Sequence, residues 1–201
     1  ALFLHMDISK SEAKERAVDM LGQVGIPDPE KRFDDYPHQM SGGMRQRIMI
    51  GMALLCDPKM LIADEATTAL DATIQAQLLE MVTRRKTALI MVTHNLGIVA
   101  RYAQRINVMY AGRIIESGTV KEIWANPMHP YTEGLLSCIP VLGKKIEPIA
   151  GMPPSLIDRP DTCPFLARCK MRRKECFENP VSELKHVGGK HYTTCPVKLG
   201  V

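Results

Sequence analysis

Two adjacent carboxylates, Asp64 and Glu65, end a short apolar run that begins at Met60. The run predicts a buried strand, and the two acids lie where that strand leaves its sheet. In phosphoryl transfer an acid at such a position holds Mg²⁺, often through water, and a neighbouring carboxylate can polarise an attacking water. Asp64 is therefore a candidate magnesium ligand and Glu65 a candidate general base.

A glycine pair precedes a predicted helix upstream of these acids. Ser41, Gly42 and Gly43 come directly before the helical apolar periodicity of Met44, Ile48, Met52 and Leu55. Backbone N–H groups point outward at a helix start, the helix dipole favours negative charge, and glycine lets an anion approach closely. Each motif alone also fits a plain helix start or an exposed strand end. Their succession within one short span favours a phosphate site.

The same stretch resembles the ATPase subunit of an ABC transporter. SGGMRQR looks like the signature loop of that family, Leu61 to Glu65 looks like its Walker B strand with the catalytic glutamate, and Ala69 to Asp71 looks like its D-loop. His94, in VTHNLG, looks like the switch histidine. The form SGGMRQR, with PHQ before it and ALLCDPKMLIADE after it, is similar to the oligopeptide and dipeptide importer branch.

The resemblance implies a role for each matching position. The implied nucleotide-binding residues are Ser41, Gly42, Gly43, Met44, Asp64 and Asp71. The implied catalytic pair is Glu65, which would polarise water, and His94, which would orient the γ-phosphate. The signature loop would act in trans by completing the ATP site of an opposing subunit, and Asp71, which also resembles a helix N-cap, would link the two sites.

Two parts of the family pattern are absent from the sequence. No G-x-x-x-x-G-K-[ST] motif occurs, and none of the residues before Ser41 fits the Q-loop. We therefore expect the sequence to be the C-terminal part of a longer subunit, a fragment that binds ATP poorly by itself. Smaller departures from the family are Ala66 for the usual proline, Asn95 for the usual aspartate, and a shorter segment from Leu78 to Thr87.

The predicted fold is α/β: a P-loop NTPase-like ABC ATPase domain, incomplete at its N-terminal side, with a cysteine-rich C-terminal extension. Capping boxes at 9–12 and 119–122 predict two helix starts, and Ala111-Gly112 predicts a hairpin turn. Asn126-Pro127 breaks the pattern. The predicted division is a partial ATPase domain at 1–128 and an importer-type extension at 129–201.

The composition fits a soluble globular protein, with 45% hydrophobic and 24% charged residues. No apolar stretch reaches membrane-spanning length, and no signal peptide is visible. The net charge of +4 permits an anionic partner but does not indicate nucleic acid.

Four of the six cysteines lie close to the C-terminus, at Cys163, Cys169, Cys176 and Cys195. In a chain without a secretion signal, this clustering favours thiols or a metal site over disulfides. Compact zinc sites usually carry closely paired cysteines, and the wider gaps here suit a bulkier iron–sulfur cluster. The family resemblance also points to [4Fe–4S], with Zn²⁺ as the second choice and unliganded thiols as the third.

The resemblance implies an ATP- and Mg²⁺-dependent subunit that couples ATP hydrolysis to the import of dipeptides or oligopeptides. Its implied partners are a second ABC ATPase subunit, two membrane permease subunits and, indirectly, an extracellular peptide-binding protein, at the cytoplasmic face of the membrane. Two alternatives stay open for the importer function, a non-catalytic trans-acting fragment and a nickel importer ATPase. A third, a soluble ABC ATPase of DNA repair or translation, is disfavoured by the importer-like extension.

Overall fold

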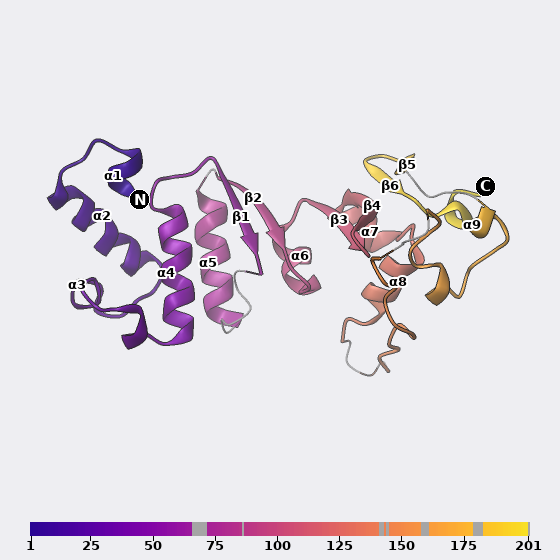
Figure 1. Cartoon of the computed structure of the whole chain (residues 1–201), viewed down its shortest axis with the longest axis horizontal. Helices are drawn as coiled ribbons and strands as arrows, with labels where there is room; N and C mark the ends of the chain where they lie inside the picture. Colours follow the sequence, from indigo (N-terminus) through magenta and orange to yellow (C-terminus); the bar gives the residue numbers. More distant parts are fainter. Residues whose placement is uncertain are drawn as a thin grey trace. The chain divides into compact units, whose positions relative to one another are not determined.

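The computed structural model describes residues 1–65, 72–85, 87–140, 143, 145–157, 161–178 and 183–200. The chain forms two compact units, Ala1–His94 and Asn95–Val201 (Figure 1). The sequence predicts a different boundary, near residue 128, between the partial ATPase domain and the importer-type extension. The division into two compact units does not test that boundary, which stays a prediction. None of the described helices is long and apolar enough to cross a membrane.

The first unit places helices beside a small parallel sheet (Figure 1). Its helices are α1 (Leu2–His5), α2 (Lys10–Gln23), α3 (Pro29–Arg32), the 3₁₀ turn η1 (Pro37–Gln39), α4 (Gly42–Leu54) and α5 (Ala72–Arg84). Its strands are β1 (Met60–Asp64) and β2 (Ala88–Val92), which pair in parallel from Met60↔Ala88 to Asp64↔Val92. A parallel pair needs a crossover, and α5 supplies it.

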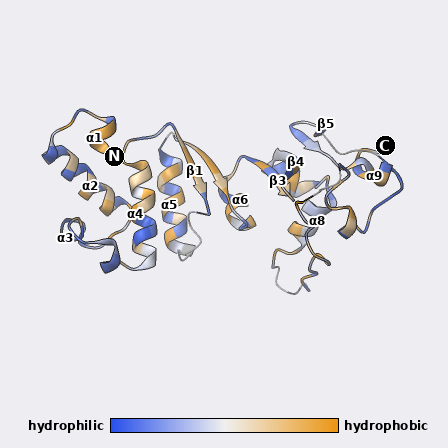
Figure 2. Cartoon of the chain, viewed as in Figure 1, coloured by the Kyte–Doolittle hydropathy of each residue, from blue (hydrophilic) through white to orange (hydrophobic). Residues whose placement is uncertain are grey.

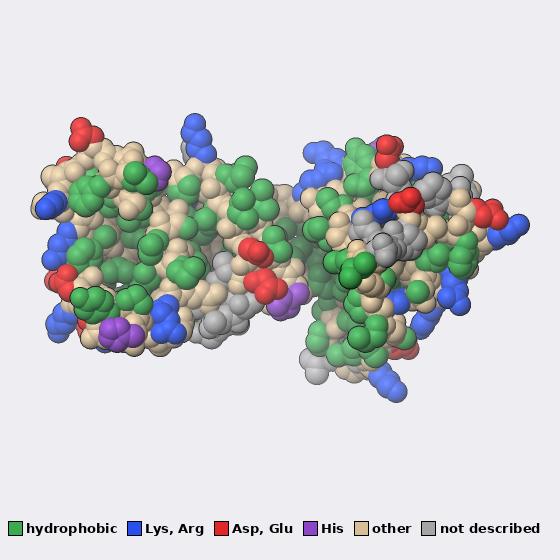
Figure 3. All heavy atoms as spheres, in the orientation of Figure 1, with side chains coloured by type: hydrophobic (Ala, Val, Ile, Leu, Met, Phe, Trp, Pro, Cys, Tyr) green, Lys and Arg blue, Asp and Glu red, His purple; other side chains and the backbone are tan. Residues whose placement is uncertain are grey.

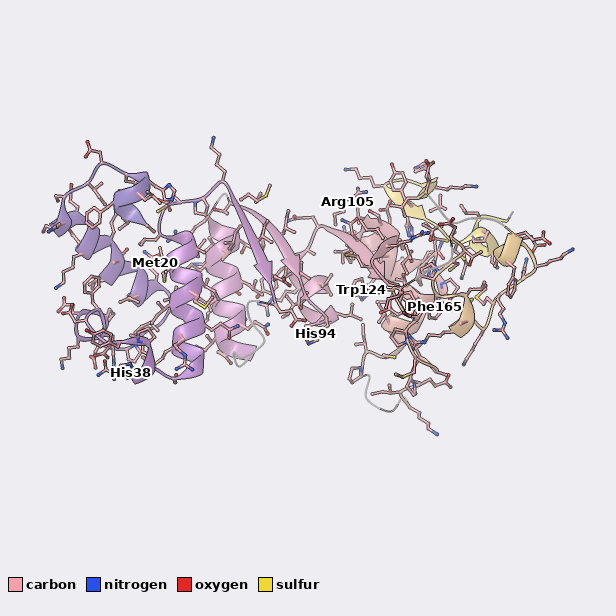
Figure 4. The ribbon with its side chains drawn as sticks, viewed as in Figure 1. Met20, His38, His94, Arg105, Trp124 and Phe165 are labelled. Carbon is pink, nitrogen blue, oxygen red and sulfur yellow. The ribbon has the colours of Figure 1, made fainter. Side chains whose placement is uncertain are left out.

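Helices α2, α4 and α5 enclose the core of the first unit. The predicted capping box at the start of α2 is present, because Ser9 Oγ accepts a bond from Glu12 N and the Glu12 carboxylate accepts one from Ser9 N. The buried core residues are Met20, Val24, Ile26, Leu54, Leu78 and Val82. Met20, labelled in Figure 4, packs against α4 at Gly51, where an added Cβ would lie 3.2 Å from Met20 Cγ.

The apolar periodicity of α4 is confirmed only in part. Met44, Ile48 and Leu55 pack against the core, whereas Met52 is 60% exposed and Leu54 is fully buried. In a helix with 3.6 residues per turn, a series spaced by four drifts away from the buried stripe. Leu54, which the four-residue spacing passes over, therefore occupies the position in the core.

The inward face of the two strands is half-buried and the outward face is exposed, so the predicted burial of the strand from Met60 to Ala63 is wrong for its outward face. Leu61 and Leu89 pack against the helical core, but Ile62 is 65% exposed and Ile90 48% exposed. Both strands are apolar along their length except for Asp64 at the end of β1 (Figure 2). A continuous apolar run predicts burial on both faces, whereas the two described strands alternate because successive side chains point to opposite faces.

The second unit is built on a four-stranded antiparallel sheet. Its strands are β3 (Arg105–Tyr110), β4 (Arg113–Thr119), β5 (Lys185–Gly188) and β6 (His191–Thr193), in the order β3-β4-β6-β5. Its helices are α6 (Leu96–Tyr102), α7 (Val120–Ala125), α8 (Pro130–Ser137), η2 (Leu166–Arg168), α9 (Glu175–Glu178) and α10 (Pro196–Leu199). The predicted hairpin at Ala111-Gly112 joins β3 to β4, and the predicted capping box at Thr119 starts α7.

An aromatic group forms the core of this second unit. Tyr110, Tyr131 and Phe165 lie with ring centroids 4.6 to 5.4 Å apart, and Phe165 is labelled in Figure 4. The guanidinium of Arg168 lies over the Tyr110 and Phe165 rings and donates to the carbonyl oxygens of Ile149 and Ala150. Arg168 therefore anchors the cysteine-bearing segment to this core.

Candidate functional site

The pairing of β1 with β2 brings Glu65 and His94 to one edge of the sheet. Parallel strands end at the same edge, and the register sets Asp64 beside Val92. His94 Nδ1 lies 3.1 Å from Glu65 Oε1. In Figure 3, acidic side chains and a histidine lie side by side at these strand ends, and His94 is labelled in Figure 4. The two side chains are more than half exposed, at 56% and 76%, so a ligand can reach them.

The backbone of Glu65 adopts a left-handed conformation, with φ of 45°. For a residue other than glycine this conformation costs on the order of 1–3 kcal/mol and persists only where the surroundings impose it. The surroundings here include a hydrogen bond of 3.0 Å from Glu65 N to Val92 O. The turn thereby directs the Glu65 side chain toward the end of β2. Asp64 ends β1 and is exposed beside it.

Of the remaining predicted residues, Ser41 is the N-cap of α4, and its Oγ accepts a hydrogen bond of 3.2 Å from Met44 N. The helix begins at Gly42, where an added Cβ would find no heavy atom within 4 Å. The tip of α4 is thus open to an approaching anion at Gly42. Asp71 lies outside the described residues, and its predicted roles stay predictions.

Two arginines of the SGGMRQR motif brace the backbone around this tip, which the sequence did not reveal. Arg45 Nη1 donates to the carbonyl oxygen of Met40 at 2.8 Å. Arg47 donates to the carbonyl oxygens of Gly43 and Gly25. Helical spacing could not identify these acceptors, because Gly25 belongs to the turn after α2 and lies far from the motif in sequence.

Asn95, which the sequence resemblance marks as a departure from the family pattern, is the N-cap of α6. Its Oδ1 accepts hydrogen bonds from Gly97 N at 3.1 Å and from Ile98 N at 3.3 Å. An asparagine oxygen caps a helix about as well as a carboxylate does. The substitution therefore keeps the helix start that follows His94 while removing one negative charge.

The four C-terminal cysteines are neighbours in the second unit. The pKa of Cys163 is raised to about 11, chiefly by burial and to a smaller extent by the charges of Cys195, Cys169 and Cys176. Burial is also the main cause of the raised pKa values of Cys169 and Cys195. All six cysteines are free thiols. Within the described ranges, however, no three His, Cys, Asp or Glu side chains are gathered closely enough to hold a metal ion.

His129 lies beside this cysteine group and was not predicted as a functional residue. It is 1% exposed, and burial lowers its pKa to about 4. Its Nδ1 accepts a hydrogen bond from Tyr131 N, which leaves the proton of the neutral ring on Nε2, 3.8 Å from Cys163 Sγ. The only sequence signal was a histidine followed by Pro130, a usual first residue of a helix.

Comparison with known families matches both parts of the chain. Residues 1–68 match the family model described as ABC transporter. Residues 115–176 match the model described as Oligopeptide/dipeptide transporter, C-terminal region. The first match contains the open helix tip and Glu65, and the second contains three of the four C-terminal cysteines.

Close relatives carry names of the same kind. The dipeptide transport ATP-binding protein DppD of Bacillus subtilis is 54% identical over 183 residues, which are 88% of this chain and 55% of that protein. The oligopeptide transport ATP-binding protein OppD of Salmonella typhimurium is 48% identical over 90% of this chain and 56% of its own length. The chain thus spans little more than half the length of these relatives.

A solved structure titled "Structure of ATP binding subunit of ABC transporter" is similar to this chain with a TM-score of 0.51 and 29% identity. The similarity covers 59% of this chain and 49% of that one. The α/β fold and the local sequence motifs therefore agree with the family comparisons. The chain belongs to the family of ABC transporter ATP-binding proteins, in its oligopeptide and dipeptide branch.

Proposed function

We propose that this chain supplies the signature half of the ATP site in a subunit that couples ATP hydrolysis to the import of dipeptides or oligopeptides. Residues 1–128 are the partial ATPase domain in this proposal, and residues 129–201 are the importer-type extension. Family membership implies ATP and Mg²⁺ as ligands. The names of the relatives support dipeptides or oligopeptides as the cargo. Nickel is the alternative cargo of this proposal.

The proximity of Glu65 and His94 carries this proposal. Their 3.1 Å contact joins a carboxylate and an imidazole, the groups that orient water and a phosphate. In the proposed reaction, Glu65 polarises the attacking water and His94 orients the γ-phosphate. Asp64 holds Mg²⁺ in the same site, whereas the tip of α4 closes over the β- and γ-phosphates of the ATP that an opposing ATPase subunit binds.

The proposed ATP contacts of this chain are Ser41, Gly42, Gly43 and Met44 at the tip of α4, with Asp71 linking the two sites of the dimer. The N-terminal end of a helix and the glycine backbone suit the charged terminal phosphate of ATP. Two membrane permease subunits and, indirectly, an extracellular peptide-binding protein complete the proposed assembly, at the cytoplasmic face of the membrane.

The test is ATP hydrolysis by the complete subunit, assembled with its permeases in vesicles. Glu65→Gln removes the charge but preserves the size of the side chain, so we expect turnover to fall by about a hundredfold or more while ATP is still bound. Thr83→Ala, in α5 and away from the strand ends, is the control and should keep normal turnover. Wild-type turnover in Glu65→Gln would refute the proposal.

A second candidate function is a non-catalytic, trans-acting lobe. The absence of G-x-x-x-x-G-K-[ST] from residues 1–201 favours it for this chain alone. An ATPase assay on this chain, beside a version extended at its N-terminus, separates the two. Hydrolysis by the extended version alone supports the catalytic function, and no hydrolysis by either supports the trans-acting one.

We further propose that Cys163, Cys169, Cys176 and Cys195 bind an iron–sulfur cluster, with Zn²⁺ as the alternative. Four thiols from one small segment are a donor set that both metals accept, and the mutual effect of the cysteines on pKa supports their proximity. A bound cluster would supply thiolate–metal bonds that tie this loop-rich segment together. The described residues hold no group arranged for a single ion, so the proposal rests on the donor set.

Metal analysis of anaerobically purified protein tests this second proposal. We expect iron and sulfide with broad visible absorbance, and a loss of both in Cys195→Ser. Cys138→Ser is a matched control in the same unit and should retain the metal. A colourless protein that carries zinc would overturn the iron–sulfur assignment, and a metal-free protein would overturn metal binding altogether.

A further inference from the structure

We propose that Glu116 and His191 form a buried clamp that positions the cysteine-bearing ends of the second unit relative to each other. The clamp consists of the Glu116 carboxylate on β4, the His191 ring on β6, the Met128 backbone and the Thr193 hydroxyl. It holds Cys195 on one side and His129, the neighbour of Cys163, on the other. It deepens the proposed thiol site, but the contacts that define it do not depend on which metal binds there.

Glu116 is the centre of the clamp. Its side chain is fully buried, and that of His191 is 7% exposed. His191 Nε2 lies 2.7 Å from Glu116 Oε1, and Met128 N donates to the same oxygen at 2.6 Å. Oε2 is also buried and has no hydrogen-bond partner among the described residues. A buried carboxylate with one unsatisfied oxygen depends strongly on the groups that contact the other oxygen.

The Thr193 hydroxyl extends the clamp to Cys195. It donates to the carbonyl oxygen of Met128 at 2.8 Å and accepts a hydrogen bond from Cys195 N at 3.2 Å. Thr194 N donates to the carbonyl oxygen of Ile115, next to Glu116 on β4, at 3.0 Å. The backbone that leads into Cys195 is therefore tied to β4 and to the loop before α8.

Met128 also leads directly to His129, whose Nε2–H points to Cys163 Sγ as described above. Both the N–H and the carbonyl of Met128 are held by the clamp. A change at Glu116 would therefore be transmitted to two cysteines, Cys163 and Cys195, that lie far apart in sequence. Glu116 acts on the two thiols through Met128 and His191, so its role is that of a positioning residue.

A second carboxylate holds the turn that precedes His191. Glu122 Oε1, on α7, accepts a hydrogen bond from Lys190 N at 2.8 Å. Gly189, with φ of 56°, lies so close that an added Cβ would collide with the same oxygen. The β5–β6 hairpin, which lies next to β4 in Figure 1, is thus held by Glu116 and Glu122 together.

Thiol labelling of the reduced, full chain tests the clamp. Mass spectrometry of the labelled peptides gives the alkylation rate of Cys195 relative to that of Cys138, a half-buried thiol in the same unit. Glu116→Gln keeps the size of the side chain but removes its charge, so we expect this ratio to rise by about tenfold or more through local opening. Thr193→Val should raise it similarly, because it removes the hydroxyl that joins Met128 to Cys195.

Glu183→Gln is the matched control, because it removes an exposed carboxylate from the same unit and should leave the ratio unchanged. Should Glu116→Gln fail to fold, Thr193→Val gives the same test. An unchanged ratio in the folded variants would overturn the clamp, and so would an equal acceleration of Cys138 and Cys195, which indicates general destabilisation. Since the assay needs no iron, a failed iron–sulfur proposal and a failed clamp are distinguishable.

Discussion

The substitution Gly42→Ala should raise the stability of the chain and lower its proposed ATP turnover. The helix α4 begins at Gly42, and an added Cβ would meet no heavy atom within 4 Å. Glycine costs up to about 1 kcal/mol relative to alanine in a helix, and less at its first residue. We therefore expect unfolding of the first unit to become harder by about 0.3–1 kcal/mol, a rise in its melting temperature of roughly 2–6 °C.

The same methyl group would occupy the space through which a phosphate approaches the helix tip. A displacement of about 1 Å at a reacting group can cost roughly a hundredfold in rate. We expect ATP turnover by the complete subunit, assembled with its permeases, to fall by about 10- to 100-fold. The variant would thus be more stable and less active, a combination that general damage to the fold does not produce.

The assays are urea denaturation of the 201-residue chain and phosphate release by the assembled transporter. Gly22→Ala is the control, because Gly22 lies in α2, where an added Cβ would make an ordinary contact of 3.7 Å with Pro29. It should stabilise the chain by a similar amount and leave turnover unchanged. Normal turnover in a Gly42→Ala variant that is more stable than wild type would refute the close approach of a phosphate to Gly42. A Gly42→Ala variant that is less stable than wild type would refute the conclusion that there is free space for a Cβ at Gly42.

Two further predictions concern stability alone. Leu54→Ala should lower the free energy of unfolding by about 3–5 kcal/mol, because Leu54 is fully buried, whereas Met49→Ala, at a 68% exposed position, should change it by less than about 0.5 kcal/mol in urea denaturation. Glu122 has its pKa lowered to about 2, chiefly by the backbone N–H of Lys190 and then by Thr119. Its stabilising effect is therefore complete above about pH 4.5, the value of an unperturbed glutamate, and is lost as the pH falls toward 2. Unfolding midpoints of wild type and Glu122→Gln should converge over that range, and a constant difference would contradict the assigned contacts.

The elements that local sequence controls were predictable. Capping boxes at Ser9 and Thr119 start α2 and α7 because a hydroxyl and a carboxylate three residues apart satisfy each other's backbone N–H groups. The hairpin turn at Ala111-Gly112 and the alternation of helix and strand between Gly42 and Val92 follow from turn chemistry and periodicity in the same way. Such features depend on near neighbours in the chain.

Burial was harder to predict, because it depends on what packs against each face. The run from Met60 to Ala63 is apolar throughout, yet Ile62 is exposed and Leu61 packs inward. In α4 the core position belongs to Leu54, which the four-residue spacing from Met44 passes over. Hydropathy indicates which side chains can be buried, whereas the packing of neighbouring elements decides which side chains are buried.

By itself, the sequence determined the capped starts of α2 and α7, the hairpin between β3 and β4, the acid pair at the end of β1 and the family to which the chain belongs, because these follow from residue type and local spacing. Only the tertiary structure brought His94 to Glu65, Arg47 to Gly25 and His191 to Glu116. Each of these contacts joins residues that are distant in the chain. Their geometry depends on strand register and helix packing, which arise only when the whole unit folds.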